Sequence, residues 1–175
     1  MKIPTLTTPR LLLRAFHADD LDTYAGYCAD ERFMQYLMTG RPISREEAWA
    51  NMASILGHWA LRGYGVFALE RRDDGMLVGF SGLLNPLGWP GLEVCWGLGP
   101  EHWGQGLATE AVEAVIDWAF ARDAVDEVIS LIHPDNLRSV ALAERVGEVF
   151  RDEIAFKGKR LRVYHIRKAD RQGRR

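Results

Sequence analysis

The sequence predicts one domain of the α+β (mixed α/β) class, and three observations lead to this expectation. The chain has 175 residues, a length typical of a single domain. Hydrophobic residues make up 47% of the chain, which is enough for a sizeable core. Segments with strand-like and helix-like patterns follow one another without a repeat or a linker, so we expect a single sheet flanked by helices.

The first part of the chain is expected to form one strand and three helices. The strand and the first two helices cover, in order, residues 10–16, 19–28 and 31–37. The third helix has the clearest start, because Ser44 and Glu47 have the spacing of a capping box, in which each side chain satisfies a backbone N–H of the first turn. We expect this helix to end near residue 61, with Gly63 as its stop.

The rest of the chain is expected to alternate between strands and helices. Asp73-Asp74-Gly75 is a hairpin signal between two strands, and Lys157-Gly158-Lys159 joins the last two. Apolar residues at helical spacing identify the helix after the third of these strands. The expected strands cover residues 66–71, 76–84, 92–98, 127–132, 149–156 and 161–167, and the expected helices cover 108–120 and 137–145.

Charge and cysteine content narrow the class of function. Lys and Arg number 22 against 24 Asp and Glu, which argues against a nucleic-acid partner. Cys28 and Cys95 lie far apart, and no histidine or cysteine pair has metal-ligand spacing, so we expect a cytoplasmic protein without a metal. The N-terminus lacks the apolar core of a signal peptide and no run is long enough to span a membrane. We expect residues 1–168 to form the domain and 169–175 a polar, mobile tail.

The most informative stretch, residues 93–111, combines a strand, a turn of small residues and a helix start. Small residues at 104, 106 and 108 let a ligand approach the backbone closely. The first N–H groups of a helix have no partners inside it and the helix dipole is positive there, so the turn suits phosphate oxygens. A plain glycine turn before a core helix has the same spacing. Thr109 breaks the dinucleotide fingerprint, and the Gly-Lys-Ser/Thr of a P-loop is absent.

Three ordered blocks of the sequence carry a resemblance to a known family. They are Thr8-Pro9-Arg10-Leu11-Leu12-Leu13-Arg14, then Trp103-Gly104-Gln105-Gly106-Leu107-Ala108, then Asn136-Leu137-Arg138-Ser139-Val140-Ala141-Leu142-Ala143-Glu144-Arg145-Val146-Gly147. Together they resemble the GCN5-related N-acetyltransferase (GNAT) superfamily, in particular its ribosomal-protein N-acetyltransferase branch. The resemblance covers almost the whole chain.

The chain departs from the family pattern at three places. Trp103 stands where the superfamily usually has Gln or Arg, although Trp is common there in the branch. Ala143 stands where many relatives carry a Tyr that protonates the leaving thiolate. An aromatic residue usually follows the glycine at 147, so Glu148-Val149-Phe150 indicates a shift of one residue.

The resemblance implies a GNAT fold, with a central mixed, largely antiparallel sheet that is flanked by helices and splayed at the cofactor site. The splay would separate the strand ending at Leu98 from the strand beginning near Glu127. The resemblance also implies acetyl-CoA as co-substrate, no metal, and a monomer or homodimer. Arg145 would reach an adenosine phosphate or simply lie exposed on its helix. The residues expected to bind acetyl-CoA are Trp96, Gly97, Leu98, Trp103, Gly104, Gln105, Gly106, Leu107, Ala108, Thr109 and Asn136.

Acetyl transfer to an amine needs a base for the amine proton and a donor for the departing thiolate. The resemblance and its place among apolar neighbours make Glu93 the expected base; a Glu paired with Arg or Lys, or one at an exposed strand edge, is the structural alternative. Ser139 is the expected acid, or else a first-turn Ser that caps its helix or faces water.

Three further residues have weaker assignments. Cys95 is more simply a small buried residue than an acetylated nucleophile. His102 is expected at the surface, and Trp89 is the best candidate for a substrate wall in an exposed loop. We therefore expect an N-acetyltransferase acting on a protein N-terminal or small-molecule amine, with a non-catalytic acyl-CoA-binding sensor or scaffold as the alternative.

Overall fold

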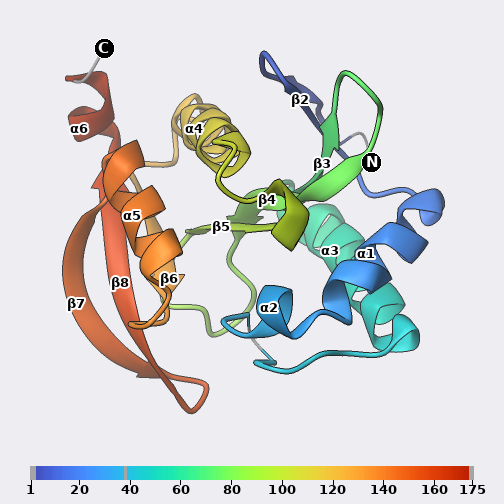
Figure 1. The fold of residues 1–175 in the computed structure, drawn as a ribbon. Coiled ribbons are helices and arrows are strands. Elements are labelled where there is room, and N and C mark those ends of the chain that lie inside the picture. The colour runs from blue at the N-terminus through green and yellow to red at the C-terminus, as the bar shows by residue number, and fades with distance from the viewer. Residues whose placement is uncertain (1–2, 38, 174–175) are drawn as a thin grey trace.

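The computed structural model describes residues 3–37 and 39–173, and its central feature is an eight-stranded sheet (Figure 1). The strands lie in the order β1-β2-β3-β4-β5-β6-β8-β7. They are β1 (Leu6–Thr7), β2 (Leu11–Arg14), β3 (Val66–Arg71), β4 (Leu77–Leu84), β5 (Glu93–Leu98), β6 (Glu127–Ile132), β7 (Val149–Phe156) and β8 (Lys159–Arg167). The helices are α1 (Leu21–Cys28), α2 (Glu31–Met34), α3 (Arg45–Arg62), α4 (Leu107–Phe120), α5 (Leu137–Val146) and α6 (Lys168–Gln172).

Local sequence signals place most of these elements where they are expected. Ser44 and Glu47 form the capping box of α3, and Gly63 ends that helix in the left-handed conformation with φ of 72°. The helix expected over 31–37 stops at Met34, because the next residues form three-residue turns such as the bond from Leu37 N to the Met34 carbonyl. The chain therefore reaches α3 through a loop.

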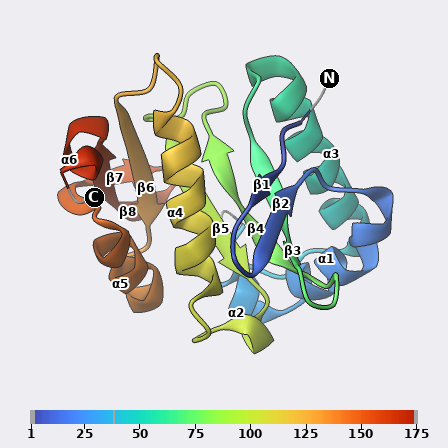
Figure 2. The ribbon, with the colours of Figure 1, turned by 90° about the horizontal axis from the view of Figure 1, so that it is seen from above.

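Helices cover both faces of the sheet, and each face has its own core (Figure 2). One core packs α4 and α5 on the sheet through buried residues such as Val94, Val115 and Val146. The other packs α1, α2 and α3 through residues such as Tyr24 and Phe33. The sheet is thus buried between two helical layers, and a ligand that reaches its middle must enter where neighbouring strands separate.

That separation lies between β5 and β6, as the family resemblance implies. The two strands are parallel and pair at one position, Glu93 with Ile129, whereas every other pair of neighbouring described strands is antiparallel. Beyond this pair the strands diverge, which leaves Trp96 and Leu98 without a β6 partner. The expected mixed, largely antiparallel and splayed sheet is confirmed.

Two C-terminal segments refine the expectation. The register between β7 and β8 shifts between Phe150 and Asp152, close to the irregularity expected at 148–150. The residues expected to form a polar, mobile tail include most of α6, and Arg171 in that helix bonds to Asp117 at 3.0 Å and to the Val146 carbonyl at 3.2 Å. This part of the tail is therefore held against the domain.

Candidate active site

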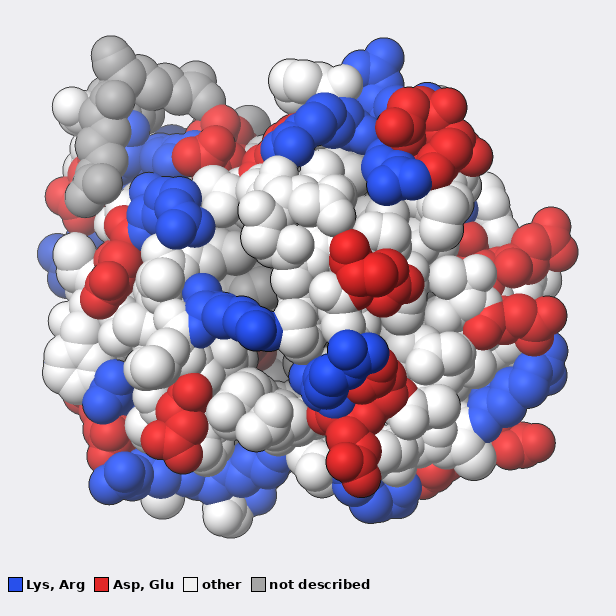
Figure 3. Space-filling model, viewed as in Figure 1, with Lys and Arg blue, Asp and Glu red and all other residues white. Residues whose placement is uncertain are grey.

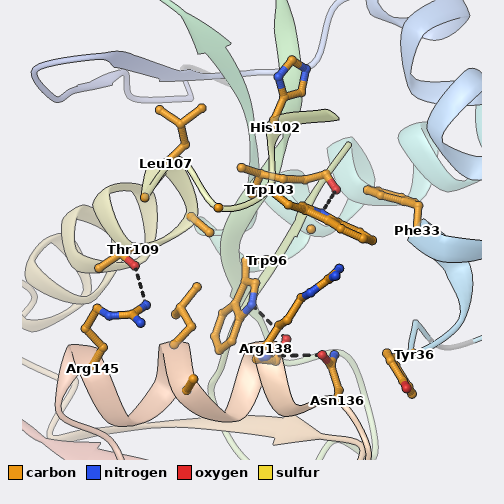
Figure 4. Close-up of a pocket in the computed structure, with 18 of the residues that line it drawn as sticks. Phe33, Tyr36, Trp96, His102, Trp103, Leu107, Thr109, Asn136, Arg138 and Arg145 are labelled. Carbon is orange, nitrogen blue, oxygen red and sulfur yellow. Dashed lines mark hydrogen bonds between the residues drawn. The ribbon is translucent and has the colours of Figure 1, made fainter. Parts of the chain in front are cut away.

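A cavity of about 1240 Å³ opens beside the splay, and Figure 3 shows Lys and Arg side chains on both sides of the hollow. Its floor includes Trp96, Gly97 and Leu98 of β5. One wall is the turn before α4 with the first residues of that helix, and the opposite wall is the start of α5. Phe33 and Tyr36, in and just after α2, line the end nearest the loop to α3 (Figure 4).

The turn before α4 has no side chain that caps the helix. Gly104 and Gly106 have φ of 74° and 77°, a left-handed conformation that strains other residues. Gly106 occupies the N-cap position and has no side chain to accept a hydrogen bond, whereas Ser44 caps α3 and Asn136 caps α5. The first N–H groups of α4 therefore lie in the cavity wall without a capping side chain, which suits an anionic ligand.

Arg10 holds this turn against the N-terminal strands. Its Nη1 donates to the Gln105 carbonyl at 2.8 Å, and its Nε donates to Glu110 of α4 at 2.6 Å. Thr8 also donates to Glu110, at 2.6 Å. Arg10 is about half exposed and lines the cavity, so its guanidinium adds positive charge beside the glycine turn. Arg10 lies in the first block of the family resemblance, which by itself assigns the residue no role.

Further arginines surround the same wall. Arg138 of α5 lies over the Trp103 ring, with its guanidinium carbon 4.3 Å from the ring centroid. Arg145 donates to the Thr109 hydroxyl at 3.4 Å (Figure 4). Trp103 itself donates to the Leu98 carbonyl at 2.8 Å, which fixes its ring between the turn and β5. An anionic ligand in this cavity would meet guanidinium groups from both walls.

Ser139 points its hydroxyl toward β5. Trp96 Nε1 donates to the Ser139 hydroxyl oxygen at 3.3 Å, and Asn136 Oδ1 accepts from the Ser139 backbone N–H at 3.3 Å (Figure 4). Asn136, not Ser139, is therefore the helix cap, and the Ser139 hydroxyl proton is available to a ligand. Ala143 is fully buried, and its cluster includes Trp96 at the edge, so the indole packs near the position where many relatives have a Tyr.

Glu93 is buried at the start of β5, 8% exposed, and its partners are neutral donors. Trp89 Nε1 donates to Glu93 Oε2 at 2.6 Å, and the Leu131 backbone N–H also donates to this carboxyl group. Burial raises the pKa of Glu93 to about 7, although both hydrogen bonds oppose the shift. A carboxyl group with this pKa exchanges a proton near neutral pH, as a general base must. Neither expected alternative, an Arg or Lys pair or an exposed edge, describes it.

A smaller cavity of about 60 Å³ connects the two candidate catalytic residues. Glu93, Trp96 and Ser139 all line it, together with Asn136. It lies at the splay and shares Trp96 and Ser139 with the larger cavity. The base and the acid expected from the sequence therefore face one continuous region from different strands and helices.

Most of the expected acetyl-CoA residues line the larger cavity. The exception is Gln105, whose side chain is exposed and donates to the Glu101 carbonyl. The residues that line it are Trp96, Gly97, Leu98, Trp103, Gly104, Gly106, Leu107, Ala108, Thr109 and Asn136. Arg10, Phe33, Tyr36 and Arg138 line it as well, although none of them was named as an acetyl-CoA residue: Arg10 and Arg138 lie in the family blocks without an assigned role, and Phe33 and Tyr36 lie in the segment that leads to α3.

Three weaker expectations are also settled. His102 is buried, not at the surface, because its Nε2 lies 3.1 Å from the Tyr27 hydroxyl. Burial raises the pKa of Cys95 well above its usual range, so its thiol stays neutral. Trp89, the candidate for a substrate wall, has partners within the protein. It donates a hydrogen bond to Glu93 and packs edge-on against Phe156, with ring centroids 5.0 Å apart.

No group of His, Cys, Asp and Glu among the described residues has the arrangement of a metal site. No helix in the described ranges is long and apolar enough to cross a bilayer.

Comparisons with known proteins place this geometry in a family. A family model described as an acetyltransferase (GNAT) domain matches residues 10–149. An acetyltransferase of Agrobacterium tumefaciens is 31% identical, with a TM-score of 0.83 and 95% of each chain covered. The uncharacterized N-acetyltransferase YnaD of Bacillus subtilis is 27% identical over 142 residues, 81% of each chain. RimL, a ribosomal L7/L12 acetyltransferase in complex with coenzyme A, shares the fold with a TM-score of 0.78 at 16% identity, over 94% of this chain and 98% of RimL. The chain therefore belongs to the acetyltransferase (GNAT) domain family and is an acetyltransferase.

Proposed function

We propose that this protein transfers an acetyl group from acetyl-CoA to a primary amine by direct attack on the thioester. The acceptor is a protein N-terminal amine, as in the ribosomal-protein branch, or a small-molecule amine. The observation that carries the proposal is that one cavity joins an uncapped helix start, suited to phosphates, to a splayed strand pair with a buried carboxyl group beside it.

Acetyl-CoA fits the two ends of the cavity by chemistry. Its pyrophosphate would accept hydrogen bonds from the N–H groups of residues 104–109, with Arg10 and Arg138 nearby. Its pantetheine arm carries amides that would pair with backbone groups of Trp96 and Leu98 that have no β6 partner, like an added strand; the Leu98 carbonyl already accepts from Trp103, which leaves the Leu98 N–H. RimL and an aminoglycoside acetyltransferase that share the fold are both solved with coenzyme A.

Glu93 is proposed as the base. The amine nitrogen attacks the thioester carbonyl carbon, the C–S bond breaks, and the nitrogen loses a proton to Glu93 directly or through a water. About one-seventh of α-amino groups are neutral at pH 7, against about one in a few thousand lysine side chains. A carboxyl group with a pKa of about 7 is matched to the first kind of amine.

Ser139 is proposed as the donor to the leaving sulfur. Its oxygen accepts from Trp96, so its own proton is available for a hydrogen bond to the thiolate that forms as the C–S bond breaks. The thiolate then takes its proton from solvent. Direct attack is favoured over an acetylated Cys95, because burial raises the pKa of that thiol and keeps it protonated.

The test is release of the coenzyme A thiol from acetyl-CoA with a panel of amines. The panel contains peptides with free N-termini, the same peptides already N-acetylated as matched controls, polyamines and aminoglycosides. We expect one amine class to release thiol and gain the mass of an acetyl group. Binding of acetyl-CoA without release by any amine would favour the sensor or scaffold alternative, and absence of binding would refute the proposal.

A further inference from the structure

The strand ladder between β5 and β6 ends in an unusual way. Ile129 N donates to the Leu92 carbonyl at 2.9 Å, and in a regular parallel ladder the next bond would join Leu131 N to the Val94 carbonyl. Side chains replace this bond on both sides. The Leu131 N–H donates to Glu93, and the Val94 carbonyl accepts from the Ser130 hydroxyl at 3.1 Å. The point where the strands separate is therefore set by two side chains.

Ser130 has a second contact that its single proton does not serve. Its Oγ lies 2.9 Å from Glu148 Oε1, in addition to its bond to Val94. A hydroxyl group donates one hydrogen bond, and a carbonyl oxygen donates none. Both contacts of Ser130 Oγ can be hydrogen bonds at the same time only if the Ser130 proton goes to the Val94 carbonyl and Glu148 donates to Ser130, because the carbonyl oxygen has no proton to give. Glu148 is then a neutral carboxylic acid.

The surroundings of Glu148 agree with a bound proton. The residue is 2% exposed, and its Oε2 is a buried oxygen without a hydrogen-bond partner. A bare carboxylate oxygen there would be far costlier than the carbonyl oxygen of a neutral acid. Burial and the charge of Glu93 raise the pKa of Glu148 to about 8.

Charged groups on the neighbouring elements are engaged elsewhere. Arg171 of α6 binds Asp117 of α4 at 3.0 Å, and His165 of β8 binds Glu127 of β6 at 2.8 Å. Arg145 of α5 is exposed and reaches Thr109. No group of opposite charge among the described residues thus offsets a negative Glu148, whereas Glu93 across the splay adds repulsion.

We propose that Glu148 is a positioning residue for acetyl transfer. As a neutral acid it donates to Ser130, directs the Ser130 hydroxyl to the Val94 carbonyl, and so fixes the separation of β5 and β6 beside Glu93. The chain of bonds ends on a carbonyl oxygen, which cannot pass a proton on, so it positions strands and does not relay protons. The inference rests on the proposed function for its effect on rate, but the protonation of Glu148 does not.

Two variants and a control test the assignment. Glu148→Gln keeps a neutral donor of similar shape, Ser130→Ala removes the bond to Val94, and Glu127→Gln removes a β6 carboxylate that lies away from the splay. At pH 7 we expect Glu148→Gln to keep kcat within about twofold, and Ser130→Ala to lower kcat about tenfold to a hundredfold with less effect on KM. Above the Glu148 pKa, kcat of the wild type and the Glu127→Gln control should fall relative to that of Glu148→Gln.

Two readouts need no acetyl transfer. The infrared carbonyl band of a protonated carboxylic acid at pH 7.5 should be weaker in Glu148→Gln than in the wild type. The carbonyl ¹³C shift of Val94 should change in Ser130→Ala and stay in place in Glu148→Gln.

Each failure has a separate meaning. Without a change in the infrared band, Glu148 is ionised and the inference is wrong even if the enzyme is active. If Ser130→Ala keeps full kcat, or if Glu148→Gln loses as much at pH 7 as Ser130→Ala, the positioning role is refuted. If no amine is acetylated while the band and the Val94 shift behave as expected, the proposed function fails and the protonated Glu148 stands.

Discussion

The two ends of the site handle charge in opposite ways. At the turn before α4, Arg10 is about half exposed. Its guanidinium group and the uncapped N–H groups of the helix can bind a negatively charged ligand there. At the β5–β6 junction, Glu93 and Glu148 are buried and their pKa values are raised, so the ionised form of each carboxyl group is disfavoured. Water screens charges in the first region, whereas burial strips most of the hydration from the carboxyl groups in the second. The first region is suited to binding anions and the second to exchanging protons.

The largest expected effect is at the binding end. Gly106→Trp puts a bulky side chain on a residue with φ of 77° beside Arg10, so the stabilisation of the fold by acetyl-CoA should disappear. Gly75→Trp is the matched control, because Gly75 has φ of 73° and open space around it in the β3–β4 hairpin. Thermal melts with and without acetyl-CoA give the measurement. If the ligand still raises the Tm of Gly106→Trp as much as that of Gly75→Trp, the turn is not the binding site.

The next effect belongs to the proton-exchanging end. Glu93→Gln should lower kcat/KM by about 10²–10⁴, the usual contribution of a general base. Wild-type kcat/KM should rise as pH passes about 7, where Glu93 loses its proton, and the variant should lack this rise. The ratio of wild-type to variant kcat/KM should therefore be greatest just above pH 7. It should shrink as the pH approaches the pKa of the amine, where more of the amine is already neutral. A loss of equal size at every pH would assign Glu93 to positioning instead.

A smaller loss is expected for Ser139→Ala. A donor used only as charge develops on sulfur affects kcat more than acetyl-CoA affinity, and losing it should cost about 2.7–4 kcal/mol if it acts like an oxyanion-hole contact. Ser44→Ala, which removes a helix cap far from the cavity, controls for a general loss of helix stability. Weaker acetyl-CoA binding with unchanged turnover at saturation would make Ser139 a binding residue.

The last effect is on the free energy of unfolding and not on the rate, and it tests the buried carboxyl groups without any ligand. The folded-state pKa of Glu148, about 8, lies above the ordinary value of 4.5, so the folded protein holds a proton that the unfolded chain releases. Wild-type stability should therefore fall between pH 4.5 and 8, with Glu148 contributing about 1.4 kcal/mol per pH unit. Urea unfolding at pH 5 and pH 8 should show a smaller fall for Glu148→Gln. Equal slopes would mean that Glu148 is ionised when folded.

Much of the fold follows from local sequence, and less of the site does. The α3 capping box and the left-handed glycine turns are set by neighbours along the chain, so Ser44, Glu47 and Gly106 could be assigned directly. The burial of Glu148 depends on Ser130, 18 residues away, and that of His102 on Tyr27, 75 residues away. No local pattern reports such contacts, so His102 was misplaced and Glu148 was seen only as an irregularity.

Glu93 lies between these cases. Its apolar neighbours indicate a costly carboxyl group, which is a local signal. Its actual partners are Trp89, four residues earlier, and a backbone N–H of β6 that the splay leaves unpaired. The sequence could therefore name the residue as unusual, but not the pair of neutral donors that leaves its pKa near 7.

The single pair between β5 and β6 also has a mechanical meaning. One side of the seam contains β1 to β5 and the other β6 to β8, and the backbone ladder joins them at Glu93 and Ile129. Amides that face the seam beyond this pair lack a strand partner, so they should exchange faster than amides of the fully paired strands. The core that spans both sides of the seam keeps the sheet one unit, so a molecule that pairs along the seam should slow exchange there more than elsewhere.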